Sequence, residues 1–299
     1  MQADRPFVDT PPGPTALTDH AARVGAADLG LGTPQLLRSG MNALYMCGDV
    51  VLRVGRTNAP PEVAIELAHH LSAAGIPVPR PASDRAVAVG ELSVTAWRRL
   101  APTDDPVDWA AVGRAAARLH DIAPSTLPAA VPLPLPSAFP WWRFDAVLGD
   151  VAGDIDERAL AGLQAAIDRH RGWLDPERDE LVVCHGDVHP GNVAMTADGV
   201  VLLDWDLLCL APRGWDHAPM MTWAERWGGA PGEYEAMAAG YGRSLRGDDQ
   251  AEAMAELRLV AATLMRVRAG RSDPVARAEA GRRLRYWRGE PGAPAWTPQ

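Results

Sequence analysis

The chain has 299 residues, enough for one large core or for two lobes. Its hydrophobic share of 47% is ordinary for a globular protein, and its net charge of -9 argues against a nucleic-acid partner. The same charge is compatible with a cationic substrate drawn to an acidic cleft, although a merely acidic globular protein would carry it too.

Membrane and export signals are not apparent in the sequence. No apolar stretch approaches the length needed to span a bilayer, and the N-terminus lacks a basic-then-apolar signal pattern. The three cysteines are an odd number in a chain too large to need disulfides, which suggests reduced thiols. We therefore expect a cytoplasmic protein with no membrane partner, either monomeric or dimeric.

The first hundred residues are predicted to be rich in β-structure. A Pro-rich arm precedes a helix that Thr18 caps and that ends near Leu29. Apolar runs separated by turn residues predict three antiparallel strands between Leu36 and Gly55 and a hairpin over residues 86–97. Between them, Pro60-Pro61 starts a helix that runs to about Ala74.

From Asp104 onward the apolar spacing predicts long helices, over residues 107–122, 158–174, 233–245, 250–268 and 274–287. Residues 141–157 combine aromatic side chains with five acids. Trp142 and Asp145 in this segment are candidates to face a cationic, ring-bearing substrate. The competing interpretation is that the aromatic rings pack in the core and the acids are solvated, and it is the commoner arrangement.

Two motifs stand close together near the middle of the helical part. An apolar run over residues 181–184 is followed by His185-Gly186-Asp187-Val188-His189-Pro190-Gly191-Asn192, in which Pro190-Gly191 disfavours a helix and predicts a loop. A second apolar run over residues 200–203 leads directly into Asp204-Trp205-Asp206. We expect the two runs to be strands of one small hairpin-like unit that brings Asp187, Asn192 and Asp204 to one edge.

Carboxylate and carboxamide oxygens that converge in this way suit a hard cation such as Mg²⁺. Phosphoryl transfer requires an oriented nucleophile and neutralised phosphate oxygens. Asp187 would orient a substrate hydroxyl and accept its proton, while Asn192 and Asp204 would bind Mg²⁺ that bridges the nucleotide phosphates. The order of Asp, then Asn five residues on, then Asp on the next strand is that of the protein-kinase catalytic loop and metal site.

The two motifs differ from those of protein kinases in a consistent way. The first reads His-Gly-Asp instead of His-Arg-Asp, and the second reads Asp-Trp-Asp instead of Asp-Phe-Gly. In both respects the segment resembles the aminoglycoside phosphotransferase and choline kinase-like family, strongly over residues 181–206 and faintly before residue 100. The resemblance implies an α+β, bilobal protein-kinase-like fold, with a small β-rich lobe over residues 1–97 and a larger, mainly helical lobe over residues 98–299.

The same resemblance implies roles for individual residues. Asp187 would be the catalytic base, Asn192 and Asp204 the magnesium ligands, and His185 and Asp216 the side chains that brace the catalytic loop. The turn that contains Ser39, Gly40 and Asn42 would lie over the nucleotide phosphates, and the purine would lie beside Ala96, Trp97 and Arg99. Asp187 and Asp206 join Trp142 and Asp145 as candidates for contact with the acceptor.

All 29 basic residues are arginines, so the chain has no lysine for the phosphate-binding position that protein kinases fill with one. Arg53 stands at that position, and a guanidinium can bridge phosphate oxygens with a different geometry. This role needs an acidic partner on the following helix, for which Glu66 is preferred to Glu62. The alternative is an edge-strand arginine that faces water.

These observations favour an ATP- or GTP-dependent, Mg²⁺-requiring phosphotransferase that acts on a hydroxyl of a small molecule, with an aminoglycoside or another cationic antibiotic as the favoured acceptor. A metabolic kinase for choline, homoserine or a sugar-like alcohol is the first alternative. A catalytically silent nucleotide-binding protein is the second, and the missing lysine is what favours it. A zinc cluster of Cys184, His185, Asp187 and His189 is a weaker alternative, because the loop lacks the helix and the Glu of zinc-protease motifs.

Overall fold

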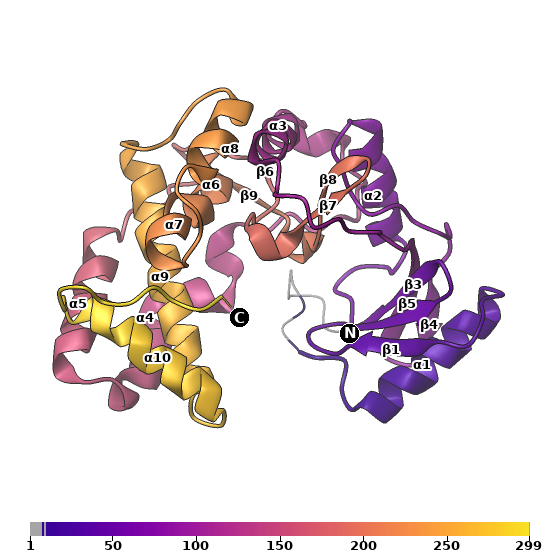
Figure 1. Ribbon diagram of the computed structural model, residues 1–299, viewed down its shortest axis with the longest axis horizontal. Helices are drawn as coiled ribbons and strands as arrows, with labels where there is room; N and C mark the ends of the chain where they lie inside the picture. The colour runs from indigo at the N-terminus through magenta and orange to yellow at the C-terminus, as the bar shows by residue number, and fades with distance from the viewer. Residues whose placement is uncertain (1–7, 9, 299) are drawn as a thin grey trace. The chain divides into compact units, whose positions relative to one another are not determined.

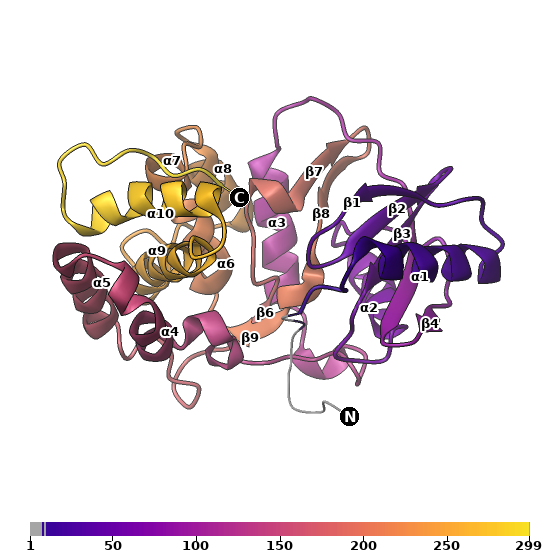
Figure 2. The ribbon, with the colours of Figure 1, turned by 90° about the horizontal axis from the view of Figure 1, so that it is seen from below.

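The computed structural model describes residue 8 and residues 10–298, which pack into two compact units. The first consists of the described residues up to Asp108 together with Ala117–Pro134 and Pro190–Cys209. The second consists of Trp109–Ala116, Leu135–His189 and the described residues from Leu210 onward. Figure 1 shows their elements in chain order, and Figure 2 shows them from a second direction. The predicted division into residues 1–97 and 98–299 remains a prediction.

A five-stranded antiparallel sheet forms the centre of the first unit, with the strand order β1-β2-β3-β5-β4. In β2 the alternate residues Ala43, Tyr45 and Cys47 are buried, and in β5 the first five residues are buried. Arg53 in β3 is paired with Leu44 of β2 and Thr95 of β5, so it lies on a central strand and not on an edge. The strands are β1 (Gln35–Arg38), β2 (Ala43–Cys47), β3 (Val50–Gly55), β4 (Val87–Val89) and β5 (Leu92–Arg98).

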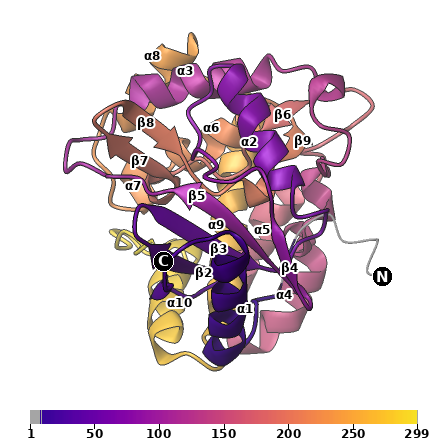
Figure 3. The same ribbon diagram turned by 90° about the vertical axis from the view of Figure 1, so that its right-hand side faces the viewer.

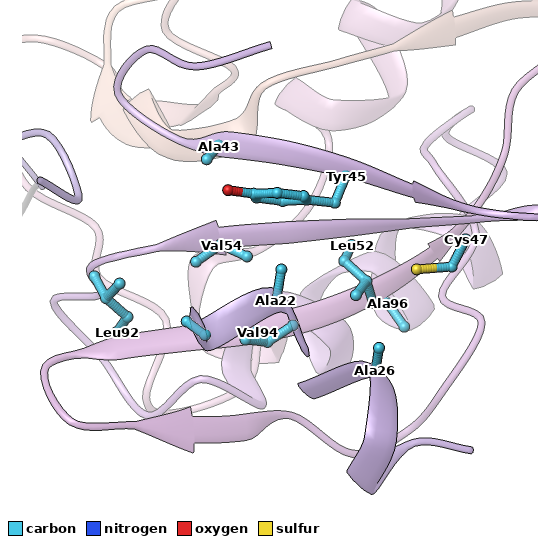
Figure 4. Close-up of a cluster of buried hydrophobic side chains, with 11 residues drawn as sticks. Ala22, Ala26, Ala43, Tyr45, Cys47, Leu52, Val54, Leu92, Val94 and Ala96 are labelled. Carbon is cyan, nitrogen blue, oxygen red and sulfur yellow. The ribbon is translucent and has the colours of Figure 1, made fainter. Parts of the chain in front are cut away.

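Helix α1 (Thr15–Asp28) packs against this sheet, as Figure 3 shows. Small side chains allow the close approach, since a Cβ on Gly25 would lie 2.6 Å from Val94 Cγ1. Thr18 does not cap the helix as predicted. It lies in the first turn, fully buried, where its hydroxyl hydrogen-bonds the Thr15 carbonyl oxygen and the Tyr45 hydroxyl. Figure 4 shows Tyr45 within the hydrophobic cluster between helix and sheet.

The first unit also contains helix α2 (Val63–Ala73) and a small hairpin of β7 (Val193–Thr196) and β8 (Gly199–Leu202). The one-turn helices η5 (Pro190–Asn192) and η6 (Trp205–Leu207) stand before and after the hairpin. Main-chain hydrogen bonds join it to the rest of the unit, from Leu202 N–H to the Pro77 carbonyl oxygen at 2.8 Å and from Thr103 N–H to the Met195 carbonyl oxygen at 2.9 Å.

The predicted pairing of the two strands beside the motifs is wrong. Strand β8 pairs with β7, whereas β6 (Val182–Cys184) pairs with β9 (Cys209–Ala211). The cause is a tight turn after Thr196, in which Gly199 has a φ of 109° that favours glycine. This turn folds residues 193–196, which the apolar pattern did not mark as a strand, directly onto β8.

The second unit is mainly helical, and its longest helix is α9 (Asp249–Ala269), which is buried on several sides. Helices α5 (Glu157–Arg169) and α10 (Pro274–Trp287) pack against α9 and against each other, as Figure 2 shows. Among the described residues, no helix has the length and apolar character required to span a bilayer. The other helices are α3 (Trp109–His120), whose last residues belong to the first unit, α4 (Phe144–Val151), α6 (Gly214–Met221), α7 (Trp223–Arg226) and α8 (Glu233–Tyr241). The two units together give the predicted α+β class.

Candidate functional site

The loop that follows β6 is hydrogen-bonded to a buried carboxylate. Asp216, on α6, is fully buried and accepts hydrogen bonds from the N–H groups of His185 at 2.9 Å and Gly186 at 2.8 Å. Gly186 has a φ of 92°, a value that favours glycine, and the chain turns there before Asp187. This geometry is what the bracing role predicted for Asp216 requires.

Asp187 is the next residue, and its side chain is one-third exposed. Its carboxylate oxygens lie 3.3 Å from His189 Nε2 and 3.6 Å from a guanidinium nitrogen of Arg258. Burial raises the pKa of Asp187, but the hydrogen bond from His189 and the charges of His189, Arg258 and His185 outweigh it, so the pKa lies below its usual value. Asp187 is therefore an ionised acceptor at neutral pH, suited to orienting a hydroxyl.

Two partners of Asp187 were missed by the sequence reasoning. Arg258, on α9, donates to the carbonyl oxygens of Gly186 at 2.5 Å and Trp215 at 3.2 Å, and its guanidinium lies 4.5 Å from the centre of the Trp215 ring. His189 stacks on Trp223 with a centroid separation of 5.7 Å. His189 belongs to the loop motif and was visible as such, whereas Arg258 lies in a helix without any motif.

Asn192 and Asp204 are brought to the same end of the β7–β8 hairpin. Val193 pairs with Leu202, and the Leu203 N–H donates to the Asn192 carbonyl oxygen at 2.8 Å, which continues the pairing up to the two residues. Asp204 has φ 60° and ψ 71°, and it is the one non-glycine residue with positive φ within residues 8 and 10–298. Such backbone strain, of about 1–3 kcal/mol, commonly accompanies a functional side chain.

The donor set at this hairpin end fits the predicted magnesium ion. A carboxylate and a carboxamide supply hard oxygen ligands, and Mg²⁺ is usually bound by one or two carboxylates together with substrate phosphates. The alternative zinc cluster is not assembled in the described part of the chain, where no such ligand group forms among Cys184, His185, Asp187 and His189. Cys184 is buried and its thiol lies 3.6 Å from the Ala211 carbonyl oxygen.

Two of the predicted phosphate-binding residues of the first unit, Asn42 and Arg53, meet at Asp206. Oδ2 of Asp206 accepts hydrogen bonds from the Asn42 amide at 3.2 Å and from the Arg53 guanidinium. Ser39 is exposed in the turn before Asn42. Asp206 thus contacts the candidate nucleotide residues, although the sequence pointed to it as a contact for the acceptor.

The expected partner of Arg53 on α2 does not pair with it. Glu66 and Glu62 are exposed, and neither forms an ion pair with Arg53 in the described structure. The helix-based prediction assumed the arrangement of protein kinases. Instead, Arg53 pairs with Asp206, two residues after the candidate metal ligand Asp204.

The predicted purine-binding segment is bonded to its neighbours in the first unit. Ala96 is buried in the sheet core, and its carbonyl oxygen accepts from the Ala82 N–H at 2.9 Å. The Trp97 indole N–H donates to Thr95 Oγ1 at 2.8 Å, and the Arg99 N–H donates to the Asp49 carbonyl oxygen at 2.9 Å. These particular groups are therefore already engaged, and a purine would have to use others in the segment.

The candidate acceptor residues Trp142 and Asp145 line a pocket of about 500 Å³ in the second unit. Trp142 is buried, with ring centroids 5.0 Å from Trp173 and 4.5 Å from Trp215, and Asp145 is exposed and ion-paired with Arg171. Three of the segment's other four acids are also paired with arginines that follow α9, Asp150 and Asp154 with Arg271 and Asp156 with Arg288. The packed-aromatic interpretation therefore describes Trp142, and the acids are partly neutralised.

The comparisons with known proteins agree with the motifs. Residues 43–259 match the model of the APH family, described as the phosphotransferase enzyme family. No curated protein sequence matches the chain. Three similar solved structures share its protein-kinase-like fold.

The first is the GDP and kanamycin complex of APH(2")-IIia, with a TM-score of 0.67 and 14% identity over 90% of this chain and 97% of that one. The second is the amicoumacin kinase hAmiN with AMP-PNP and Ca²⁺, with a TM-score of 0.64 and 15% identity over 88% and 90%. The third is a choline/ethanolamine kinase family protein from Mesorhizobium loti, with a TM-score of 0.60 and 18% identity over 91% and 94%. At these identities the likeness concerns the fold.

Proposed function

Because the chain belongs to the APH phosphotransferase enzyme family, we propose that it transfers the γ-phosphoryl group of ATP or GTP to a hydroxyl of a small molecule. The observation that carries the proposal is the strained Asp204 beside Asn192 at one end of the β7–β8 hairpin. Asn192 and Asp204 would hold Mg²⁺, which when bound neutralises charge on the phosphate oxygens.

Asp187 would orient the acceptor hydroxyl and take its proton. Its lowered pKa keeps the carboxylate ionised and able to accept a hydrogen bond at neutral pH. The proton moves to Asp187 as the acceptor oxygen bonds to phosphorus and the bond from phosphorus to the nucleoside diphosphate breaks. His185 and Asp216 would keep the loop in place for this step, since Asp216 fixes two successive main-chain N–H groups.

For the acceptor we propose an aminoglycoside or another cationic antibiotic. The kanamycin and amicoumacin complexes among similar structures support this class, as does the net charge of -9. A metabolic alcohol such as choline is the second candidate, supported by the choline/ethanolamine kinase family protein with the same fold. The bound nucleotides GDP and AMP-PNP in similar structures support either purine nucleotide.

A substrate screen tests the proposal. The protein is incubated with Mg²⁺ and ATP or GTP against a panel of aminoglycosides, other cationic antibiotics and metabolic alcohols, and products are scored by mass for an added phosphate. Asp187→Ala should lower turnover by about 10²–10⁴-fold while nucleotide binding persists. The matched control Asp249→Asn changes an exposed acid of α9 and should leave turnover unchanged. Wild-type turnover in Asp187→Ala would refute the role of that residue.

A further inference from the structure

The carboxylate of Asp206 connects three elements of the first unit. Its Oδ2 accepts hydrogen bonds from Arg53 on β3 and from Asn42 in the turn before β2, while Asp206 itself lies in η6, two residues after Asp204. The Asp206 side chain is 38% exposed and that of Arg53 is 28% exposed, so the pair is reachable by solvent. A ligand in solution can therefore reach the guanidinium without unfolding the unit.

The position of Asn42 beside Asp206 depends on a glycine. A Cβ on Gly55, at the end of β3, would lie 2.1 Å from Asn42 Oδ1, which is far inside van der Waals contact. Only the absence of a side chain at residue 55 allows the Asn42 amide to lie over the strand and reach Asp206. The contact between Asn42 and Asp206 is therefore part of how the strand is built.

Arg53 keeps most of its hydrogen-bonding capacity in this arrangement. A guanidinium carries five N–H donors, and in the described structure the Arg53 side chain uses its Nη2 group toward Asp206 and forms no other hydrogen bond or ion pair. A planar guanidinium can bond one anion along one edge and a second anion along another, whereas an ammonium is a single point charge. The pairing with Asp206 thus leaves donors for a phosphate.

We propose that Asp206 is the positioning residue for Arg53, and that the pair takes the place of the lysine and helix-borne glutamate of protein kinases in binding the phosphates of a nucleoside di- or triphosphate. The inference rests on the proposed function. Asp206 holds the guanidinium beside η6, and the remaining N–H groups of Arg53 bind phosphate oxygens. The acids of α2 take no part, in accordance with their exposed positions away from any ion pair with Arg53 in the described structure.

Calorimetric titration with ADP and with GDP, each with and without Mg²⁺, tests the pair without any need for an acceptor. Asp206→Asn and Arg53→Met should each weaken binding about tenfold, the weight of one charge-assisted hydrogen bond. The double variant should bind no more weakly than Arg53→Met alone, because both changes act through one guanidinium. Glu66→Gln, the matched control on α2, should bind within about twofold of wild type.

Arg53→Lys adds a test of the bridging geometry, and its affinity is predicted to lie between those of Arg53→Met and the wild type, because an ammonium can contact both Asp206 and a phosphate but lacks the planar fork of donors. Thermal unfolding of each variant without nucleotide confirms that the exposed substitutions leave the fold intact. The inference is overturned if Glu66→Gln weakens binding as much as Asp206→Asn, if the two losses add, or if Asp206→Asn binds more tightly. Absence of nucleotide binding by the wild-type protein would overturn the proposed function as well, whereas normal binding by all variants overturns only this inference.

Discussion

Replacing Arg258 by Met should lower the stability of the fold and raise the pKa of Asp187. The Arg258 side chain is 16% exposed, donates to two main-chain carbonyl oxygens and lies 3.6 Å from the Asp187 carboxylate. Methionine can fill much of the space beside Trp215 but offers no donor and no charge. Two carbonyl oxygens and one carboxylate then lose a partner, and each must be resolvated.

The magnitude follows from these contacts. Hydrogen bonds from a charged donor contribute about 1.5–3 kcal/mol each, and removal of one partner of a buried ion pair costs about 3–5 kcal/mol. Because Asp187 is one-third exposed and water can replace part of the loss, we expect the free energy of unfolding at pH 7 to fall by about 3 kcal/mol. Arg268→Met on the same helix removes a half-exposed pair with Asp150 and should cost less than about 1 kcal/mol.

The pH dependence distinguishes lost charge from lost packing. A carboxylate whose folded pKa lies below its usual value stabilises the fold above the unfolded pKa, near 3.8 for Asp187, and this stabilisation disappears as the pH falls through the lower folded pKa. Without Arg258 the pKa of Asp187 should rise. The destabilisation by Arg258→Met should therefore be largest above about pH 5 and shrink as the pH falls below about 4.

Urea unfolding between about pH 2.5 and pH 7 measures this difference, and carbon NMR of the Asp187 carboxyl, assigned with Asp187→Asn, follows the titration directly. Arg268→Met should leave the Asp187 titration where it is in the wild-type protein. If Arg258→Met cost the same free energy at every pH and the Asp187 carboxyl titrated unchanged, the electrostatic reasoning would be refuted and Arg258 would act through packing alone.

Three further changes test how the fold holds these groups. Asp216→Asn replaces one carboxylate oxygen, which accepts a hydrogen bond from a buried main-chain N–H, by an NH₂ group that cannot accept it. Urea unfolding should show that the free energy of unfolding falls by about 3 kcal/mol, and an unshifted unfolding curve would contradict this. Gly240→Ala would place a Cβ 1.9 Å from the Ala110 carbonyl oxygen of α3 and should lower the free energy of unfolding by at least about 2 kcal/mol. Gly281→Ala, in open space within α10, should instead raise it by about 0.5–1 kcal/mol. Equal effects of the two changes in urea unfolding would argue against tight packing of α3 on α8. Gly55→Ala should displace the Asn42 amide and weaken ADP binding severalfold in a titration, and unchanged affinity would mean that Asn42 is not needed there.

The local features of the site could be predicted from the sequence because they depend on neighbours along the chain. Pro190-Gly191 indicated a loop, and the apolar run before Asp204 indicated a strand, which β8 confirms. The long helices followed from apolar spacing, and α10 spans Pro274–Trp287 as predicted. What the pattern did not contain was β7, because its four residues are only partly apolar and its pairing is imposed by the turn at Gly199.

Partner choice over long separations could not be predicted in the same way. Arg53 and Asp206 are 153 residues apart, and any acid that the fold brings near β3 would satisfy the same charge requirement. The kinase resemblance pointed to an acid of the following helix, Glu66 or Glu62, because it assumed that a shared fold brings a shared pairing with it. Arg171, Arg271 and Arg288 likewise neutralise acids of residues 145–156 from elsewhere in the chain, which removes much of the local charge that had suggested a cationic substrate.

The absence of lysine has different consequences at different positions. At an exposed site such as Arg178, paired with Asp175 three residues away, an ammonium would serve as well as a guanidinium. Arg258 is different, because it bonds two carbonyl oxygens, approaches Asp187 and stacks on Trp215 at once. A point charge has no flat face and no fork of donors for that combination. An arginine-only composition can arise from coding bias, yet at Arg258 the guanidinium performs a task that lysine would not reproduce.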